Sequence, residues 1–323
     1  MGRSLTGRSL RLVSLVTAAS LALVACDDVN DTTASGGVSD PSSSASAFPM
    51  TIAAANGKVT VPARPARIVS LSPTATEMLF AIGAGDQVVA VDDQSNYPPE
   101  APMTRLSGYD PNAESIVSYD PDLVVYANDL GDVAKALDQL RVPALLDPAA
   151  ANLRDVYAQI EQLGEVTGHD DDASKLVASM RSDIADIVAS VPKPASPLSY
   201  YHELDDTYYS VTSSTFIGKV YSLLGLKNIA DAADKGGSGY PQLSPEYIVD
   251  ADPDLVFLAD TKCCNQSAAT VAKRPGWDRI AAVRHGDVIG LDDDIASRWG
   301  PRIVDFLRTV AAAVERVEQH EAA

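Results

Sequence analysis

The sequence predicts an α/β protein of two Rossmann-like lobes, each with a parallel sheet, joined by one long rigid α-helix. First, eleven residues that start at Glu114 recur from Glu246 onward, and eight of the eleven positions are identical. Second, short apolar segments typical of buried strands alternate with helical segments in both halves, which is the pattern of parallel sheets. Third, residues 170–191 lie between the halves and contain neither Gly nor Pro, so they predict a long, unbroken helix.

The expected N-terminal lobe spans residues 58–169. Its first helix is expected to begin near Pro73, a residue suited to a first helical turn, and to end at Gly83. Each copy of the repeat predicts a short helix, a turn at Asp-Pro-Asp and a buried strand. In order, the expected segments are strand 67–71, helix 75–82, strand 88–91, strand 123–127, helix 133–140 and strand 144–146.

Residues 170–193 are expected to form the helix that links the lobes, and residues 194–323 the C-terminal lobe. The helix starts with three Asp residues, which favour the positive end of a helix dipole, and Pro192 ends it. About twenty residues at 1.5 Å each give a rod of ~30 Å, which predicts lobes held at a fixed spacing. The expected elements of the C-terminal lobe include strand 255–259 and helix 303–317.

The N-terminus has the pattern of an export signal. Three Arg residues precede an apolar run at residues 12–25, which is too short to span a bilayer. The run ends in Leu-Val-Ala-Cys26, which resembles the lipobox of bacterial lipoproteins. We therefore expect a signal peptide at 1–25, a lipid on Cys26 and a flexible Ser- and Asp-rich tether at 26–57. The protein would then be anchored in the cell membrane on its extracytoplasmic side.

Composition excludes several classes of function. With 44 acidic and 25 basic residues the net charge is −19, which disfavours binding to nucleic acid. Four scattered His argue against a bare zinc or manganese receptor, so no metal site is expected. A secreted hydrolase is the rival class, but nucleophile-elbow, zinc-protease and P-loop motifs are missing from the sequence. Two acid runs, Asp92-Asp93 and Asp292-Asp293-Asp294, could serve as carboxylate pairs but are interpreted as solvated loops. We expect no cofactor and a monomer.

Three segments together resemble the substrate-binding proteins of ABC importers for vitamin B12, ferric siderophores and haem. They are residues 67–86, the Asn-Tyr-Pro-Pro-Glu segment at 96–100 and the repeated Asp-Pro-Asp-Leu-Val element. The resemblance covers about residues 58–317. It implies a non-enzymatic protein of two α/β lobes that binds a ligand in the cleft between them and delivers it to a membrane permease.

The resemblance also implies a role for the acids of the repeat. In the vitamin B12-binding protein of this family one surface Glu on each lobe docks into the permease, and its motif falls on Glu114 and Glu246. A structural interpretation competes with this one. Asn112 and Ser244 have the chemistry of helix N-caps, and an acid in the first turn is favoured by the helix dipole.

Cleft residues follow from the same resemblance. Tyr97, Tyr109, Tyr240 and Asp294 match positions near the ligand, and Arg298 could supply a local positive patch. Amphipathic rings suit a flat ligand, although a partly buried core aromatic or a loop acid would look the same in the sequence. The expected ligand is cobalamin, with a ferric siderophore as the alternative and haem, held by a Tyr, as a further one.

The sequence departs from the vitamin B12 pattern at three places. Tyr240 stands where the family has a Trp, and Trp299 stands where the family has a smaller residue. The adjacent Cys263 and Cys264 are also unusual. They could form a strained disulfide or remain thiols, and two Cys alone are too few for a metal site. These departures leave the ligand open within the family.

Overall fold

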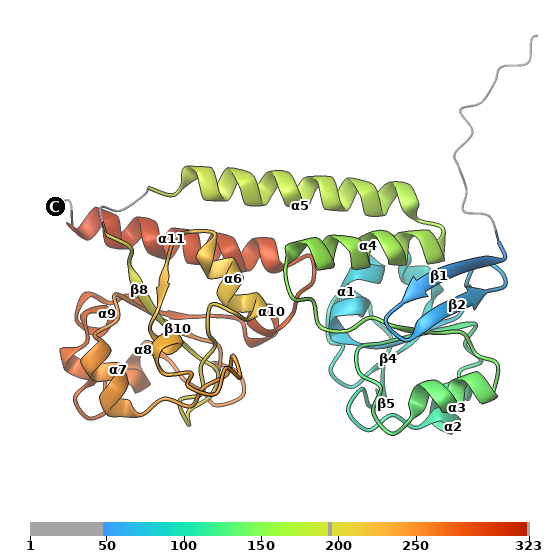
Figure 1. Cartoon of the computed structure of the whole chain (residues 1–323), viewed down its shortest axis with the longest axis horizontal. Coiled ribbons are helices and arrows are strands. Elements are labelled where there is room, and N and C mark those ends of the chain that lie inside the picture. Colours follow the sequence, from blue (N-terminus) through green and yellow to red (C-terminus); the bar gives the residue numbers. More distant parts are fainter. Residues whose placement is uncertain (1–47, 193–195, 322–323) are drawn as a thin grey trace, which may run out of the picture. The chain divides into compact units, whose positions relative to one another are not determined.

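A computed structural model describes residues 48–192 and 196–321. The predicted signal peptide, Cys26 and most of the predicted tether lie outside these residues. The described chain forms an N-terminal lobe, a long helix and a C-terminal lobe (Figure 1). None of the helices in these two stretches is both long and apolar enough to span a bilayer.

The N-terminal lobe contains a five-stranded parallel sheet in the order β5-β4-β3-β6-β7. All four residues of both β3 and β6 are buried, because helices cover the faces of a parallel sheet. The strands are β3 (Ile68–Leu71), β4 (Val88–Asp92), β5 (Met103–Leu106), β6 (Leu123–Tyr126) and β7 (Ala144–Leu146). The helices are α1 (Pro73–Ala81), α2 (Ala113–Val117), α3 (Val133–Gln139) and α4 (Leu153–Thr167).

The C-terminal lobe contains a four-stranded parallel sheet in the order β11-β10-β8-β9. The strands are β8 (Ser199–Glu203), β9 (Lys227–Asn228), β10 (Leu255–Leu258) and β11 (Val288–Gly290). The helices are α6 (Phe216–Ser222), α7 (Pro245–Ala251), α8 (Ala268–Val271), α9 (Ala281–His285), α10 (Asp293–Ser297) and α11 (Ile303–Glu321). The final helix therefore extends beyond the predicted residues 303–317.

The two sheets share one topology. The order β4-β3-β6-β7 of the first lobe corresponds to β9-β8-β10-β11 of the second, and β5 is an addition at one edge of the first sheet. The sequence repeat forms α2 and β6 in one lobe and α7 and β10 in the other. The duplication inferred from eleven residues thus extends to the connectivity of both sheets.

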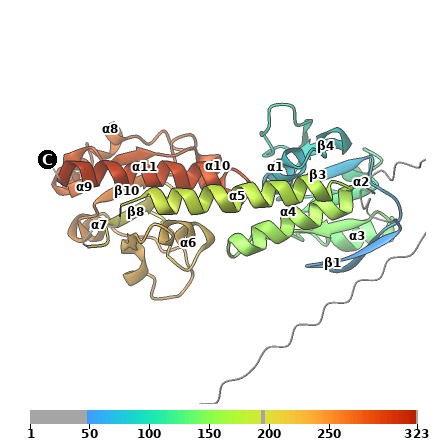
Figure 2. The same cartoon turned by 90° about the horizontal axis from the view of Figure 1, so that it is seen from above.

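The linking helix is α5 (Asp170–Ser190). It begins at the predicted residue and ends before the predicted 193, because Val191 is extended ahead of Pro192. The residues it buries recur along one face; they are Ala173, Val177, Met180 and Ile184. That face packs on α4 of the first lobe and on α11 of the second (Figures 1 and 2). One helix is therefore in contact with both lobes.

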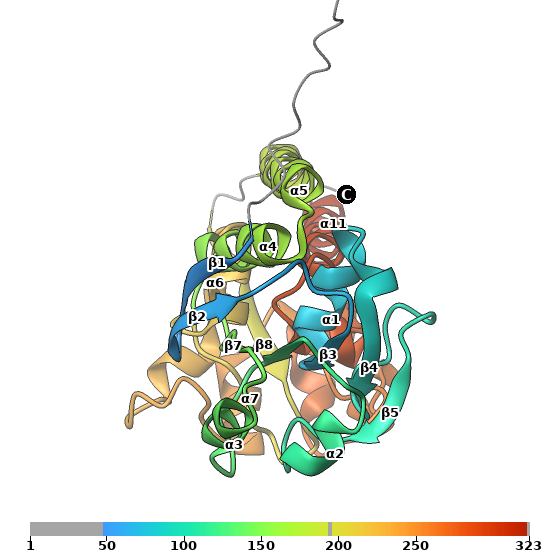
Figure 3. The same ribbon diagram turned by 90° about the vertical axis from the view of Figure 1, so that its right-hand side faces the viewer.

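The fold begins before residue 58, so the predicted end of the tether at 57 is too late. A hairpin of β1 (Met50–Ala54) and β2 (Gly57–Val61) precedes the first sheet and lies beside α4 (Figure 3). Val59 and Val61 of β2 are buried on one face, and Gly57 turns the chain with a φ of 110°. The side-chain amide of Asn56 in this turn bonds Ala144 O at 2.9 Å and Leu146 N at 3.1 Å. The two strands are only five residues each and follow about thirty polar residues, so their alternation of buried and exposed positions is hard to recognise in the sequence.

Candidate functional site

The carboxyl ends of the first sheet surround a cavity of about 210 Å³. Residues that directly follow β3, β4, β5 and β6 line it, and α10 with the loop after it supplies the opposite wall. The carboxyl edge of an open parallel sheet is where such folds bind ligands. The cavity is lined by Leu71, Ser72, Pro73, Thr74, Asp92, Gln94, Gly108, Tyr109, Ala127, Asn128, Asp294, Ser297, Arg298 and Trp299. Because both lobes contribute, this is a site between lobes.

A larger hollow of about 420 Å³ is lined by the C-terminal lobe alone. Its walls come from α9, α11 and the residues beside them, including His285 and His320. Unlike the cavity at the carboxyl ends of the first sheet, it is not lined by residues of both lobes. The described residues contain no group of three or more His, Cys, Asp or Glu that could hold a metal ion.

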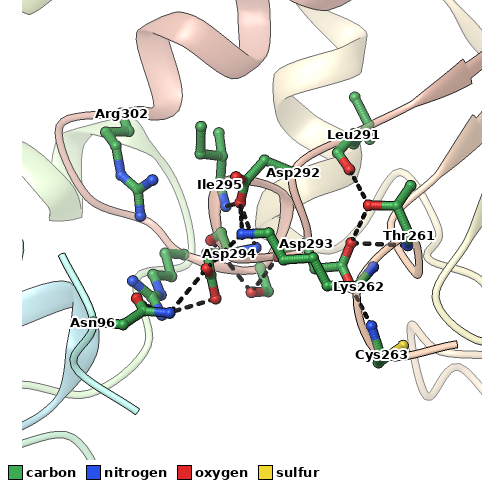
Figure 4. A network of polar contacts seen from close by, with 12 residues as sticks. Asn96, Thr261, Lys262, Cys263, Leu291, Asp292, Asp293, Asp294, Ile295 and Arg302 are labelled. Carbon is green, nitrogen blue, oxygen red and sulfur yellow. Dashed lines mark hydrogen bonds and ion pairs between the residues drawn. The ribbon is translucent and has the colours of Figure 1, made fainter. Parts of the chain in front are cut away.

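Asp294 faces the first lobe from α10 and is bonded on both carboxylate oxygens. Its Oδ2 accepts from Asn96 Nδ2 at 3.1 Å and from Lys262 Nζ at 2.8 Å, and its Oδ1 accepts from Arg298 Nη2 at 2.9 Å (Figure 4). Burial works to raise the pKa of Asp294, but these three partners together hold it below its ordinary value. The carboxylate therefore stays ionised and joins the two lobes at the cavity wall.

Asp293 fixes the loop that carries Lys262. Its carboxylate accepts from the backbone N–H groups of Thr261, Lys262 and Cys263 at 2.9–3.0 Å, and from the Thr261 hydroxyl at 2.8 Å (Figure 4). Asp292 caps α10 by accepting from the N–H of Asp294 at 3.0 Å. The run Asp292–Asp294 is therefore not a solvated loop. Its three carboxylates cap a helix, bind backbone N–H groups and form ion pairs.

Arg298 lines the cavity, but its donors bond to protein groups. Nη1 donates to Glu77 at 2.9 Å, and Nη2 contacts Gln94 O, Asn96 Oδ1 and Asp294 Oδ1 at 2.9–3.0 Å. The side chain is only 9% exposed. The positive patch expected from Arg298 is therefore largely neutralised by neighbouring acids.

Glu77 is the residue that sequence reasoning missed. It is 3% exposed on α1 and binds Arg298 and Arg302, both from the other lobe. The signal in the sequence is a single acid in the middle of the otherwise uncharged helix 75–82. A charge on such a helix is buried only when a partner meets it, and that partner is 221 residues away in the chain.

The predicted tyrosines lie in different settings. Tyr109 is 75% exposed and lines the cavity. Tyr97 is half-exposed and stacks under Arg302, outside the cavity lining. Tyr240 is 50% exposed on a loop of the C-terminal lobe and also lies outside the lining. The cavity therefore brings together Tyr109, Asp294 and Arg298 from the predicted set.

Asp92 corrects the interpretation of the Asp92-Asp93 run as a solvated loop. Asp93 is exposed, but Asp92 ends β4 with only 1% of its surface exposed and lines the cavity. Burial raises the pKa of Asp92 above its ordinary value, against bonds from Gln94 and Ser95. A Cβ atom on Gly108 would lie 2.8 Å from Asp92 Oδ2, so only glycine fits beside it. The first lobe therefore contributes a buried acid, Asp92, to the cavity wall.

Glu114 and Glu246 occupy equivalent places in the two lobes. Each is exposed in the first turn of a short helix, α2 or α7, and the predicted N-caps are confirmed: Asn112 accepts from Ser115 N, and Ser244 from Tyr247 N. Within the described chain neither glutamate has an ion pair or a side-chain hydrogen bond. Both carboxylates are open to solvent.

Cys263 and Cys264 are free thiols on the loop held by Asp293. Burial, the adjacent thiol and nearby carboxylates raise the pKa of Cys263 to about 12. The structure therefore agrees with the thiol alternative and describes Cys263 as a weak nucleophile.

Known proteins resemble this chain over most of its length. Residues 68–295 match the family model described as periplasmic binding protein. The chain is 34% identical over 277 residues to an uncharacterized ABC transporter substrate-binding lipoprotein of Bacillus subtilis (strain 168), covering 83% of this chain and 86% of that protein. It is 32% identical over 279 residues to a cobalamin-binding protein of Halobacterium salinarum (strain ATCC 29341 / DSM 671 / R1), covering 83% and 75%.

A solved structure has the same fold. The periplasmic vitamin B12 binding protein BtuF of Vibrio cholerae superposes with a TM-score of 0.66 at 26% identity, covering 79% of this chain and 98% of that one. The expected fold class and the expected absence of enzymatic activity are both confirmed by this relationship. The two-lobed architecture, the cavity between the lobes and these similarities lead to one conclusion: the chain belongs to the periplasmic binding protein family, as a substrate-binding component of an ABC transporter.

Proposed function

We propose that this protein captures cobalamin in the cleft between its lobes and delivers it to an ABC permease. The observation that carries the proposal is the cavity at the carboxyl ends of the first sheet, closed by α10 of the other lobe. The named ligands of the Halobacterium and Vibrio relatives point in the same direction. At about 210 Å³ the cavity is smaller than a typical pocket for a whole ligand, so it suits one edge of a large molecule.

The exposed tyrosines supply the remaining contact area. Tyr109 stands at the cavity, and Tyr97 and Tyr240 present half-exposed rings, each with a flat apolar face and a hydroxyl. A corrin ring carries amide side chains whose N–H groups are donors, and Asp92 and Asp294 are acceptors on opposite walls. An anionic siderophore is less suited to this cleft, because Arg298 and Lys262 are already paired with acids.

Permease docking is proposed to use Glu114 and Glu246. Two exposed carboxylates without internal partners, placed identically in two lobes, offer two equivalent points for cationic pockets on a permease. The structural interpretation explains the helix starts through Asn112 and Ser244, and gives the two carboxylates only a weak interaction with the helix dipole. The lipid on Cys26 is proposed to keep the protein at the extracytoplasmic face of the membrane where that permease resides.

Ligand identity is tested by absorbance titration of the purified protein with cyanocobalamin, a ferric hydroxamate siderophore and haem. Saturable binding of cyanocobalamin is expected, weakened by Tyr109→Ala. Leu140→Ala is the matched control, since it also removes an exposed apolar side chain from the first lobe but lies outside the cavity lining. Binding of the siderophore alone would show that the ligand is a ferric siderophore and not cobalamin. Binding of none of the three would refute the proposal.

A further inference from the structure

We propose that Glu77 is a positioning residue of the cleft, which holds two arginines of the opposite lobe and thereby sets the spacing of the lobes and the geometry of the ligand site. Its effect on ligand binding rests on the proposed function. Its effect on lobe spacing is a property of the protein alone.

The carboxylate of Glu77 is shared between two guanidinium groups. Oε1 accepts from Arg298 Nη1 at 2.9 Å and from Arg302 Nη2 at 2.5 Å, and Oε2 accepts from Arg302 Nε at 2.9 Å. The Glu77 side chain is 1% exposed, against 9% and 16% for the two arginines. A buried charge is tolerated only with close, well-oriented partners, and here each partner comes from the other lobe.

The chain around Glu77 is shaped to it. Between the two arginines lies Gly300, where a Cβ atom would stand 3.2 Å from Glu77 Oε2. That spacing is tighter than an ordinary contact, so a larger residue would push the carboxylate away. The segment from Arg298 to Arg302 therefore wraps closely around one side chain of α1.

Arg298 carries the effect of Glu77 into the cavity. Its Nη1 is held by Glu77, while Nη2 reaches Gln94 O, Asn96 Oδ1 and Asp294 Oδ1. Gln94 and Asp294 line the cavity from opposite lobes. Removal of the Glu77 charge takes away the anionic partner of Nη1 and leaves Arg298 held mainly through Nη2. We expect this to change the orientation of the guanidinium and of the Asp294 carboxylate bonded to it.

Arg302 carries the effect to the rim. Its guanidinium carbon lies 4.1 Å from the centroid of the Tyr97 ring, and its Nε and Nη2 bond to Glu77. The Glu77 carboxylate thus orients the Arg302 guanidinium that contacts the Tyr97 ring. The two routes start at Glu77 and end at a cavity acid and a rim tyrosine, which is the arrangement expected of a residue that orients a site without touching the ligand.

The molecule contains a matched control for this proposal. Glu203 is fully buried and forms a two-fold bond with Arg274 at 2.6 Å, but both residues belong to the C-terminal lobe. Glu77→Gln and Glu203→Gln remove the same charge from similarly buried sites, and the first removes an anionic partner of two arginines while the second removes that of one. Only the first change removes a bond between lobes.

The test measures the distance between lobes by electron–electron resonance of two nitroxide labels. Labels go on Lys135→Cys of α3 and Asp278→Cys of the other lobe, both exposed, in the full chain with its three native Cys changed to Ser. Glu77→Gln should shift or broaden the distance distribution, and Glu203→Gln should leave it unchanged. Arg302→Gln removes the less buried partner and should broaden it too, so the test stands even if Glu77→Gln fails to fold.

Affinity for cyanocobalamin is the second measurement. The dissociation constant should rise about tenfold in Glu77→Gln and stay within about twofold of wild type in Glu203→Gln. A folded Glu77→Gln protein with the wild-type distance distribution would overturn the positioning role. If wild-type protein fails to bind cyanocobalamin, the proposed ligand is wrong, and the distance measurement still decides the role of Glu77.

Discussion

Arg302 of the C-terminal lobe lies over the ring of Tyr97 in the N-terminal lobe, with its guanidinium carbon 4.1 Å from the ring centroid. Two residues separated by the whole length of α5 thus form a direct cation–π contact between lobes. This contact assigns Tyr97 a structural role beside its predicted place at the ligand.

Replacing Tyr97 should separate these roles. Tyr97→Phe keeps the ring and should leave the free energy of unfolding nearly unchanged, whereas Tyr97→Ala should lower it by about 0.5–2 kcal/mol. Urea unfolding followed by circular dichroism measures both. Tyr109→Ala is the control, because Tyr109 is 75% exposed and should contribute little to stability. Equal losses from Phe and Ala would mean that the hydroxyl, and not the ring, is what matters.

Glu114 and Glu246 should serve the permease and not the fold. Each exposed acid at a helix start contributes ~0.3–1 kcal/mol, so the double change to Ala should leave the protein folded with unaltered affinity for cyanocobalamin. Complex formation with the permease, measured by pull-down or uptake, should fall sharply. Asp138→Ala with Asp278→Ala removes two other exposed acids, one from each lobe, and should have no such effect. Loss of ligand binding in the glutamate variant would contradict the docking role.

Cys26→Ser should abolish lipid attachment. We expect the variant to appear in the aqueous phase on detergent partitioning, while wild-type protein follows the detergent. Replacing Cys263 and Cys264 instead should not change the partitioning, because both lie within the folded C-terminal lobe. Partitioning of Cys26→Ser like wild type would show that the anchor is not a lipid on that thiol.

The lobes should move little when ligand binds, because α5 packs on both α4 and α11 and its 21 residues include neither Gly nor Pro. Small-angle scattering with and without cyanocobalamin should give nearly the same radius of gyration. Ala178→Gly with Ser179→Gly places two flexible residues at exposed positions of the helix. The double change should increase the difference in radius of gyration between the free and the bound protein. Marked compaction of the wild-type protein would refute a rigid link.

Stability should fall as pH rises through the range of Asp147, which follows β7 and is 4% exposed. Burial raises the pKa of Asp147 to about 7 from 3.8, although Gln159 opposes the shift. Because the folded pKa lies above the unfolded one, its contribution is complete below about pH 4 and is lost as pH approaches 7. Asp147→Asn should therefore become more stable than wild type by up to about 4 kcal/mol at pH 8, with little difference at pH 4.

Thermal or urea unfolding of both proteins at several pH values tests this. Asp138→Asn provides an exposed control on the same lobe and should show no pH-dependent difference. A constant difference between Asp147→Asn and wild type across this range would contradict a buried, protonated Asp147.

The architecture follows from local patterns that the sequence displays. Buried parallel strands are continuous apolar runs, so β6 and β10 are visible as Leu-Val-Val-Tyr and Leu-Val-Phe-Leu. The repeat reveals two lobes, and the N-caps at Asn112 and Ser244 follow from their side-chain chemistry. The hairpin at Met50–Val61 and β5 are too short for their periodicity to stand out in the sequence. The helix α4 is not among the expected elements, although its buried residues recur at steps of three and four along 15 residues.

The candidate site was harder to predict. Tyr109 and Asp294 came from family resemblance, but the pairing of Glu77 with Arg298 joins residues that nothing in the local sequence connects. The sequence predicts a loop position for Asp92 because acid runs are usually solvated, and only tertiary packing buries this member of the pair. Long-range ion pairs and selective burial depend on how distant segments meet, which periodicity and spacing do not encode.

The side-chain amide of Asn56 bonds to β7, the outer strand of the first sheet, in the manner of one more strand residue. An outer strand with unpaired backbone groups is a template on which a second molecule can extend the sheet. By occupying Ala144 O and Leu146 N, the hairpin turn blocks that template with a single residue. The small hairpin thus covers part of the sheet edge at β7 and opposes edge-to-edge pairing there.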